Sequence, residues 1–195
     1  MTVVTGEYLG LAMVVFTVMP AWAEGDEHDL EKWDRMAREA SAKYAAGEIT
    51  AAMVDWQRLA KEAESFGDED VRQTLVLHNL GALHVELGRP LEALQYLEAA
   101  ARRMLRGAHK GLKEEKTLNY LAMAYVETGN YSKAERALGT VREKARARGE
   151  RSSASLTMAD LLESRIQVGR GRRKEAERTV RGALLRLKTG GQEAL

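Results

Sequence analysis

Few residues of this chain could carry out chemistry, and their spacing matches no common catalytic or metal-binding arrangement. The four histidines are His28, His78, His84 and His109, and none belongs to an HExxH motif. Cysteine is absent, which excludes thiol catalysis, disulfides and zinc–thiolate sites. We therefore predict no metal and no cofactor, and we expect a protein that is not an enzyme.

The serines and paired carboxylates also have structural explanations. Ser152, Ser153 and Ser155 lie at a predicted helix start, where hydroxyl groups cap free backbone N–H groups. A nucleophilic serine would need a base and an oxyanion site, and the sequence indicates neither. The neighbouring Glu114 and Glu115 are predicted to be solvated charges on a helix surface. His84 is predicted to be a packed core ring.

One loop, GRGRRK, is strongly basic through Arg170, Arg172, Arg173 and Lys174. It matches neither the P-loop nor the dinucleotide-binding pattern. Nucleic-acid affinity depends on such charge, but aromatic residues are not interleaved with it, so we predict no nucleic-acid partner. An acidic protein, a lipid surface and ordinary solvated charge remain as alternatives.

Charge is unevenly distributed along the chain, although the net charge is only +1. Residues 24–70 hold 6 Lys/Arg and 14 Asp/Glu, whereas residues 139–195 hold 14 and 7. This asymmetry can steer a partner or stack molecules head to tail, or it can be a solvated surface of drifting composition.

Composition favours one all-helical domain after a short leader. The 195 residues are 45% hydrophobic and 30% charged, with only two prolines, and strong helix formers dominate. Residues 8–19 form an apolar run followed by Pro20 and the small-residue pattern Ala21-Trp22-Ala23, which predicts a signal peptide over residues 1–23 with cleavage after Ala23. The run is shorter than the roughly 20 residues of a transmembrane helix.

The leader predicts a periplasmic or secreted protein with no stable membrane insertion after cleavage. One feature departs from the usual pattern, because residues 1–7 lack Lys and Arg and include Glu7. The alternatives are an uncleaved N-terminus that anchors the chain to the membrane and a packed N-terminal helix.

An internal repeat sets the expected architecture. Gly47, Gly88 and Gly129 are 41 residues apart, and each is followed five residues later by an alanine. A glycine can end a helix in the left-handed conformation, and the alanine lets the next helix approach closely. A fourth copy aligns on Gly169 and Ala176 with about two extra loop residues. The predicted helices cover residues 28–46, 49–66, 70–87, 90–106, 113–128, 131–147, 152–168 and 172–188.

This pattern resembles the tetratricopeptide repeat over roughly residues 30–188. The signature positions of the second and third copies are occupied by Leu77, Leu80, Gly81, Gly88, Ala93, Leu97, Ala100, Leu118, Leu121, Ala122, Tyr125, Gly129, Tyr131, Ala134 and Leu138. The first copy matches at Ala40, Gly47, Ile49, Ala52 and Trp56, and the fourth matches least. The spacing of 41 is similar to that of the long-repeat, kinesin-light-chain-like subgroup.

The resemblance implies an all-α solenoid of four helix-turn-helix units in a right-handed superhelix. It would occupy residues 24–190 and leave residues 191–195 as a disordered tail. We expect the last helix to cap the stack, with Val180, Ala183, Leu184 and Leu187 on its packed stripe and Arg178, Arg181 and Arg186 facing away.

The resemblance also implies a partner-binding surface on the first helix of each pair, which in this family lines the concave face. Carried onto this chain, the inner row consists of Leu75, His78, Asn79, Ala82, Val85, Lys116, Asn119, Tyr120, Met123 and Val126. The first and fourth copies add Arg38, Ser41, Tyr44, Asp160, Glu163 and Ile166. Asparagine can hold a peptide backbone through its donors and acceptor. The alternative is that these residues pack neighbouring units.

Two hypotheses for function follow. The first is an exported scaffold or adaptor that holds a protein or peptide partner in the concave groove. The second is a self-associating solenoid, a homo-oligomer in which the acidic first copy docks on the basic fourth copy of another molecule.

Overall fold

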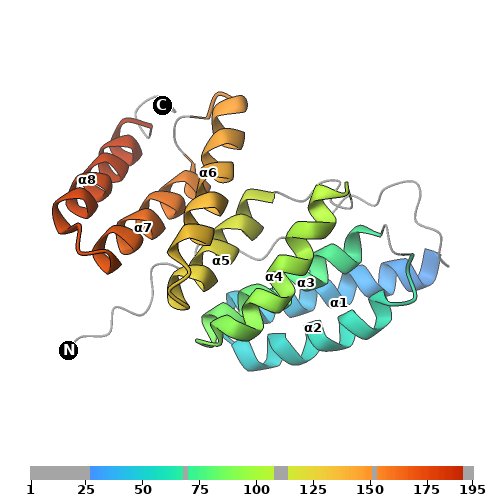
Figure 1. Ribbon diagram of the computed structural model, residues 1–195. Helices are drawn as coiled ribbons and strands as arrows, with labels where there is room; N and C mark the ends of the chain where they lie inside the picture. The colour runs from blue at the N-terminus through green and yellow to red at the C-terminus, as the bar shows by residue number, and fades with distance from the viewer. Residues whose placement is uncertain (1–26, 68–69, 108–113, 151–152, 191–195) are drawn as a thin grey trace.

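A computed structural model of the protein describes residues 27–67, 70–107, 114–150 and 153–190. The predicted leader and the predicted tail lie outside these residues. Regular structure in the described residues is entirely helical (Figure 1). The helices are α1 (Glu27–Ala45), α2 (Ile49–Ala63), α3 (Val71–Glu86), α4 (Pro90–Leu105), α5 (Glu114–Glu127), α6 (Tyr131–Ala147), α7 (Ala154–Gly169) and α8 (Arg173–Gly190).

The helices form the predicted solenoid of helix pairs. Each helix contacts its neighbours in sequence, and α3, α5 and α7 also contact one another in succession. Figure 1 shows the pairs following one another from α1–α2 at one end to α7–α8 at the other. The all-α repeat architecture is therefore confirmed. None of the described helices is long and apolar enough to cross a membrane.

The repeated glycines end the first helix of each pair as predicted. Gly88 has a φ of +67°, which is accessible to glycine without steric cost. Its N–H donates to the Val85 carbonyl at 2.9 Å, and the Arg89 N–H donates to the His84 carbonyl at 2.9 Å. This pair of bonds is the Schellman motif, which satisfies the last carbonyls of the helix. Pro90 then begins α4, where its missing N–H costs nothing.

The fourth copy follows the same rule, which corrects the predicted alignment on Gly169. The glycine with the left-handed conformation is Gly171, at a φ of +77°, and Ala176 follows it five residues later. No extra loop residues are needed, because α7 continues through Gly169. Gly169 has a packing role instead, since a Cβ there would collide with the Tyr131 ring.

The core consists of two clusters that meet at α3. The first includes Trp33 of α1 and Trp56 of α2, whose rings are 6.4 Å apart in an edge-to-face arrangement. The second extends through the remaining pairs and includes Leu97. Because α3 contributes Leu83 to the first cluster and Ala82 to the second, it joins the first pair to the rest of the solenoid.

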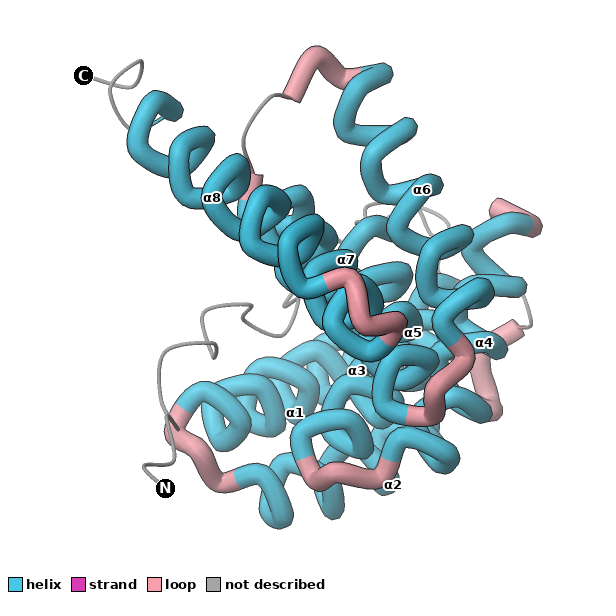
Figure 2. The backbone as a smooth tube through the Cα atoms, turned by 60° about the vertical axis from the view of Figure 1, so that its left-hand side comes forward, coloured by secondary structure: helices cyan, strands magenta, loops and turns pink. Residues whose placement is uncertain are grey.

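The last helix packs differently from the prediction. Ala176 and Ala183 are buried, whereas Leu184 and Leu187 are largely exposed. Arg186 was predicted to face away, but its guanidinium bonds to Asp160 of α7. Small residues let α8 approach α7 closely, and this packing turns the leucines outward. Figure 2 brings this end forward, with α8 in front of α7.

The helices α3 and α4 approach each other closely at Gly81, which leaves no room for a side chain there. A Cβ added at Gly81 would lie 2.5 Å from Leu97 Cγ and 3.3 Å from the Leu97 backbone nitrogen. Gly81→Ala should therefore lower the free energy of unfolding by about 1–3 kcal/mol through overpacking. Urea unfolding followed by circular dichroism measures the change.

The matched control is Gly139→Ala in α6, where a Cβ would meet nothing within 4 Å. Alanine is the better helix former, so this variant should be more stable by about 0.5–1 kcal/mol. Equal effects of the two substitutions would contradict a packing role for Gly81.

Candidate protein-binding surface

The residues considered first for chemistry have structural partners. Within the described parts of the chain, no group of three or more His, Asp or Glu residues is placed to hold a metal ion. His84 stacks on Tyr96 with ring centroids 5.2 Å apart, which confirms its predicted role as a packed ring. The Ser153 hydroxyl accepts the Leu156 N–H at 3.3 Å and caps α7, as predicted. His109 and Ser152 lie outside the described residues.

Glu114 and Glu115 are not the solvated charges that the sequence suggested. Glu114 lies 2.8 Å from the Lys144 ammonium, and the buried Glu115 pairs with the Arg148 guanidinium. Lys144 is in the last turn of α6 and Arg148 directly follows that helix, beside the first turn of α5. These ion pairs therefore join the two helices of the third unit.

Most of the inner row is buried in this conformation. On α3, Leu75, His78, Asn79 and Ala82 are buried and Val85 is half-buried; on α5, Asn119, Tyr120 and Val126 are buried, and Lys116 and Met123 are half-buried. In the outer copies, Ser41, Tyr44, Asp160 and Ile166 are buried, Glu163 is half-buried and Arg38 is exposed. Several of these side chains therefore pack neighbouring units, the alternative left open above.

Polar contacts link the inner row across three repeat units. His78 Nδ1 lies 2.9 Å from Thr117 Oγ1, and its ring meets Tyr120 edge to face with centroids 5.8 Å apart. Burial, helped by the charge of Lys116, lowers the pKa of His78 to about 4, so its imidazole is neutral near pH 7. Tyr44 donates to Glu86 Oε1 at 3.3 Å. Burial raises the pKa of Tyr44, which keeps its hydroxyl protonated.

Two asparagines of the inner row have unused hydrogen-bonding capacity. Asn79 is 0% exposed, and neither its Nδ2 nor its Oδ1 has a partner. Asn119 Nδ2 donates to the Ser155 carbonyl at 2.9 Å, but Asn119 Oδ1 has no partner. Buried polar groups are nearly always hydrogen-bonded, so these amides are exceptional in a packed helical interior.

Sequence reasoning did not identify Thr117 and Glu86 as members of this polar network. Both are outside the inner row carried over from the family, one beside Lys116 and the other at the last residue of α3. A threonine and a glutamate on a helix are usually solvated, so composition alone offers no signal for them. Their role follows from the side chains that the fold brings against them.

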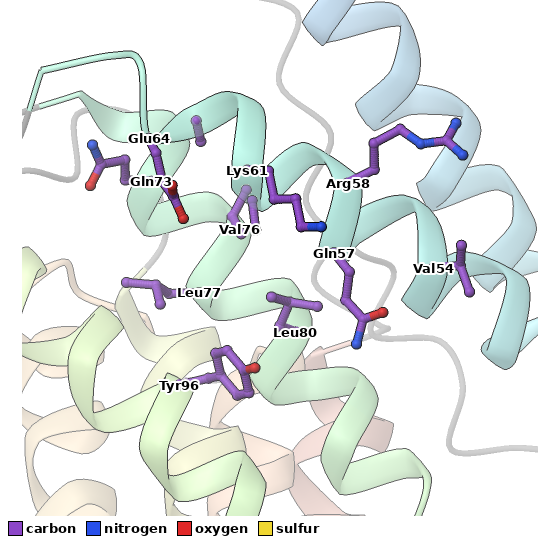
Figure 3. A pocket seen from close by; sticks show the side chains of 12 residues that line it. Val54, Gln57, Arg58, Lys61, Glu64, Gln73, Val76, Leu77, Leu80 and Tyr96 are labelled. Atoms are coloured by element: carbon purple, nitrogen blue, oxygen red, sulfur yellow. The ribbon is translucent and has the colours of Figure 1, made fainter.

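A hollow lies between α2 and the α3–α4 pair, as Figure 3 shows. It has a volume of about 710 Å³. The side from α3 and α4 is mostly apolar, whereas the side from α2 mixes apolar with polar and charged side chains. The first side consists of Gln73, Val76, Leu77, Leu80 and Tyr96, and the second of Val54, Gln57, Arg58, Ala60, Lys61 and Ala63, followed by Glu64. The sequence did not predict this hollow, because it depends on the separation of α2 from α4.

Comparison with known protein families decides the class of the fold. Residues 70–147, which include the second and third helix pairs, match the family model of the tetratricopeptide repeat. These two helix pairs are tetratricopeptide repeats. The match coincides with the two copies whose glycine and alanine positions recur most regularly. No curated protein shows a significant match to the chain.

Tetratricopeptide repeats generally mediate protein–protein interaction, and they do so by presenting helix faces rather than by holding a catalytic centre. A solenoid suits this task because its repeated units form an extended surface from one side of each unit. The function of the tetratricopeptide repeats in this chain thus depends on which of its faces receives a partner.

Proposed function

We propose that this protein is a non-catalytic scaffold that binds a segment of a partner protein along the inner row of α3 and α5. The observation that carries the proposal is the pair of asparagines with unsatisfied side-chain atoms, Asn79 and Asn119. An amide side chain can donate to a peptide carbonyl and accept from a peptide N–H. A partner backbone beside these residues would use the capacity that the chain leaves free.

The energetic cost of these amides supports a role in binding. A buried polar group without a partner destabilises a protein by about 1–3 kcal/mol. Leucine, whose side chain branches at Cγ as that of asparagine does but carries no polar atom, would avoid that cost at either position. Buried residues that destabilise the fold are expected where function requires them. Because the inner row is mostly buried, binding would include a local opening between α1, α3 and α5.

The test separates folding from binding. Asn79→Leu should raise the free energy of unfolding, since it removes two unpaired polar atoms, and should weaken partner binding. Proteins retained by the immobilised wild-type chain would be identified by mass spectrometry, and the strongest ligand would be purified. Its affinity for wild type and variant would then be measured by calorimetry.

The matched control is a residue of the hollow between α2 and the α3–α4 pair. Lys61→Glu changes an exposed side chain on α2 and leaves the inner row intact. We expect this variant to bind the purified partner as wild type does, while Asn79→Leu and Asn119→Leu each bind about tenfold more weakly or worse. Unchanged binding by both asparagine variants would refute the inner-row assignment.

We also propose that the scaffold acts after export, in the periplasm or outside the cell. The support is the apolar run of residues 8–19 followed by the Ala21-Trp22-Ala23 pattern. N-terminal sequencing of protein recovered from producing cells should begin at Glu24. Recovery of the intact N-terminus in the membrane fraction would favour the uncleaved anchor instead.

Self-association is the second proposal, and it rests on charge. The helix α8 has six Lys/Arg and two Asp/Glu, whereas residues 27–67 have 6 Lys/Arg and 9 Asp/Glu. Attraction between these ends would be screened by salt. Light scattering should then show larger particles at low salt than at high salt, and a monomer at both would eliminate self-association.

A further inference from the structure

The outer face of α8 is rich in cationic side chains. It consists of Lys174, Arg178, Arg181, Leu184, Leu185 and Lys188, which recur at helical spacing opposite the buried Ala176 and Ala183. All six side chains are exposed. Among the described helices, α8 contacts α7 alone, so no described helix covers this face.

Cationic and apolar groups are combined on this face. Lys174, Arg178 and Arg181 line one hollow at the N-terminal half of the helix together with Glu177, which pairs with Arg181. In the C-terminal half, Leu184 is 53% exposed and Leu185 63%. Large apolar side chains so exposed and so close together usually mark an interaction site.

We propose that the outer face of α8 binds the surface of an anionic phospholipid membrane. Clusters of Lys and Arg on a helix are attracted to the negative surface potential of such a membrane, and leucine side chains can enter the boundary between head groups and acyl chains. Attachment would be peripheral, with the solenoid remaining in water.

Shape and charge together favour a membrane over an acidic protein. A peptide or helix is normally held in a groove. The outer face of a single terminal helix lies between no pair of described helices, and it can touch a plane along its length. Its cations extend from residue 174 to residue 188, about 21 Å at the helical rise of 1.5 Å per residue. Figure 1 places α8 at one extremity of the molecule, where it can approach a flat surface without hindrance from other described helices.

This inference goes beyond the proposed scaffold function and does not depend on it. A chain attached through α8 would present its remaining repeats to partners near a membrane. The inner row is on α3 and α5, so both surfaces could be occupied together. A variant that loses partner binding through Asn79→Leu should bind membranes normally, which keeps the two proposals distinguishable.

The test is sedimentation of the full chain with vesicles of phosphatidylglycerol and phosphatidylcholine in equal parts, compared with pure phosphatidylcholine. The chain should pellet with the anionic vesicles alone, and added salt should release it. Lys174→Glu combined with Arg178→Glu should weaken binding by at least about tenfold, because reversing two contacts converts attraction to repulsion. Leu184→Ser should weaken it less.

The control pair is Arg58→Glu combined with Lys61→Glu on α2. This pair changes the net charge by the same amount as the α8 pair, on exposed side chains that are distant from α8 in the sequence. Both variants keep residues 1–23, so any contribution of the predicted leader to vesicle binding is the same in the two. We expect the α2 pair to retain most of the binding. The proposal would be overturned if the two double variants lost vesicle binding equally. It would also be overturned if the wild-type chain bound both kinds of vesicle equally, or did not bind anionic vesicles at low salt.

Discussion

Replacing Asp70 with asparagine should lower the free energy of unfolding by about 3–5 kcal/mol, because it leaves a buried guanidinium without its counter-charge. Asp70 Oδ1 accepts from Arg72 Nε at 2.9 Å, and Asp70 Oδ2 lies 2.5 Å from Arg72 Nη2. Both side chains are buried. The Arg72 guanidinium also lies 3.6 Å from the centre of the Phe66 ring and faces Trp33 at 6.0 Å.

Asparagine is chosen because it preserves the helix cap. Asp70 Oδ1 accepts the Arg72 backbone N–H at 2.8 Å, and an asparagine carbonyl caps a helix as well as aspartate does. The measured loss would therefore report the charge pair rather than the cap. Circular dichroism during urea unfolding gives the free energy.

A surface pair provides the comparison for Asp70. Glu177→Gln removes a carboxylate whose partner Arg181 is largely exposed, and such pairs contribute at most about 1 kcal/mol. Adding Arg72→Met to Asp70→Asn removes the unpaired charge and should recover part of the stability. If the asparagine variant is as stable as Glu177→Gln, the buried pair does not contribute the expected stability.

Trp56→Ala should be similarly destabilising, by about 3–5 kcal/mol, because it empties the centre of the first core cluster. Trp56 is fully buried and packs edge to face against Trp33. The cluster joins α1 and α2 to α3, so we expect the first helix pair to loosen before the rest of the solenoid. Hydrogen exchange should show lost protection in α1 and α2 first.

Trp56→Phe separates ring packing from the polar atom of the indole. Trp56 Nε1 has no hydrogen-bond partner, so phenylalanine removes an unsatisfied donor while keeping most of the aromatic contact. We expect the phenylalanine variant to lose far less stability than the alanine variant. Val54→Ala, at an exposed position of the same helix, should change stability by no more than about 0.5 kcal/mol. Equal losses for alanine and phenylalanine at position 56 would contradict this account.

Local rules explain why so much of the fold could be predicted from sequence. A glycine that ends one helix and an alanine that admits the next are both encoded within a few residues, as Gly88 and Ala93 show. The helix at residues 90–106 was predicted to within one residue of Pro90–Leu105. The fourth unit was misaligned because Gly169 and Gly171 are only two residues apart, and only the backbone conformation identifies which one ends the helix.

The candidate binding surface was less predictable, because a family alignment assigns positions but not burial. Asn79 was expected to hold a partner, and its complete burial and unpaired amide became apparent only when α3 was packed among its neighbours. Glu114 and Glu115 were expected in solvent until α6 brought Lys144 and Arg148 beside them. Such contacts join residues about 30 positions apart, a distance that no local pattern spans.

By itself, the sequence determined that this chain is a helical repeat protein, about where its helices begin, and that its C-terminal part is basic. Those properties depend on backbone conformation and composition, which nearby residues control. Only the tertiary structure decided which faces are covered. Small residues on α8 meet α7, so the leucines and cations of the last helix turn outward. The packing of α3 and α5 among their own neighbours buries the asparagines of the inner row.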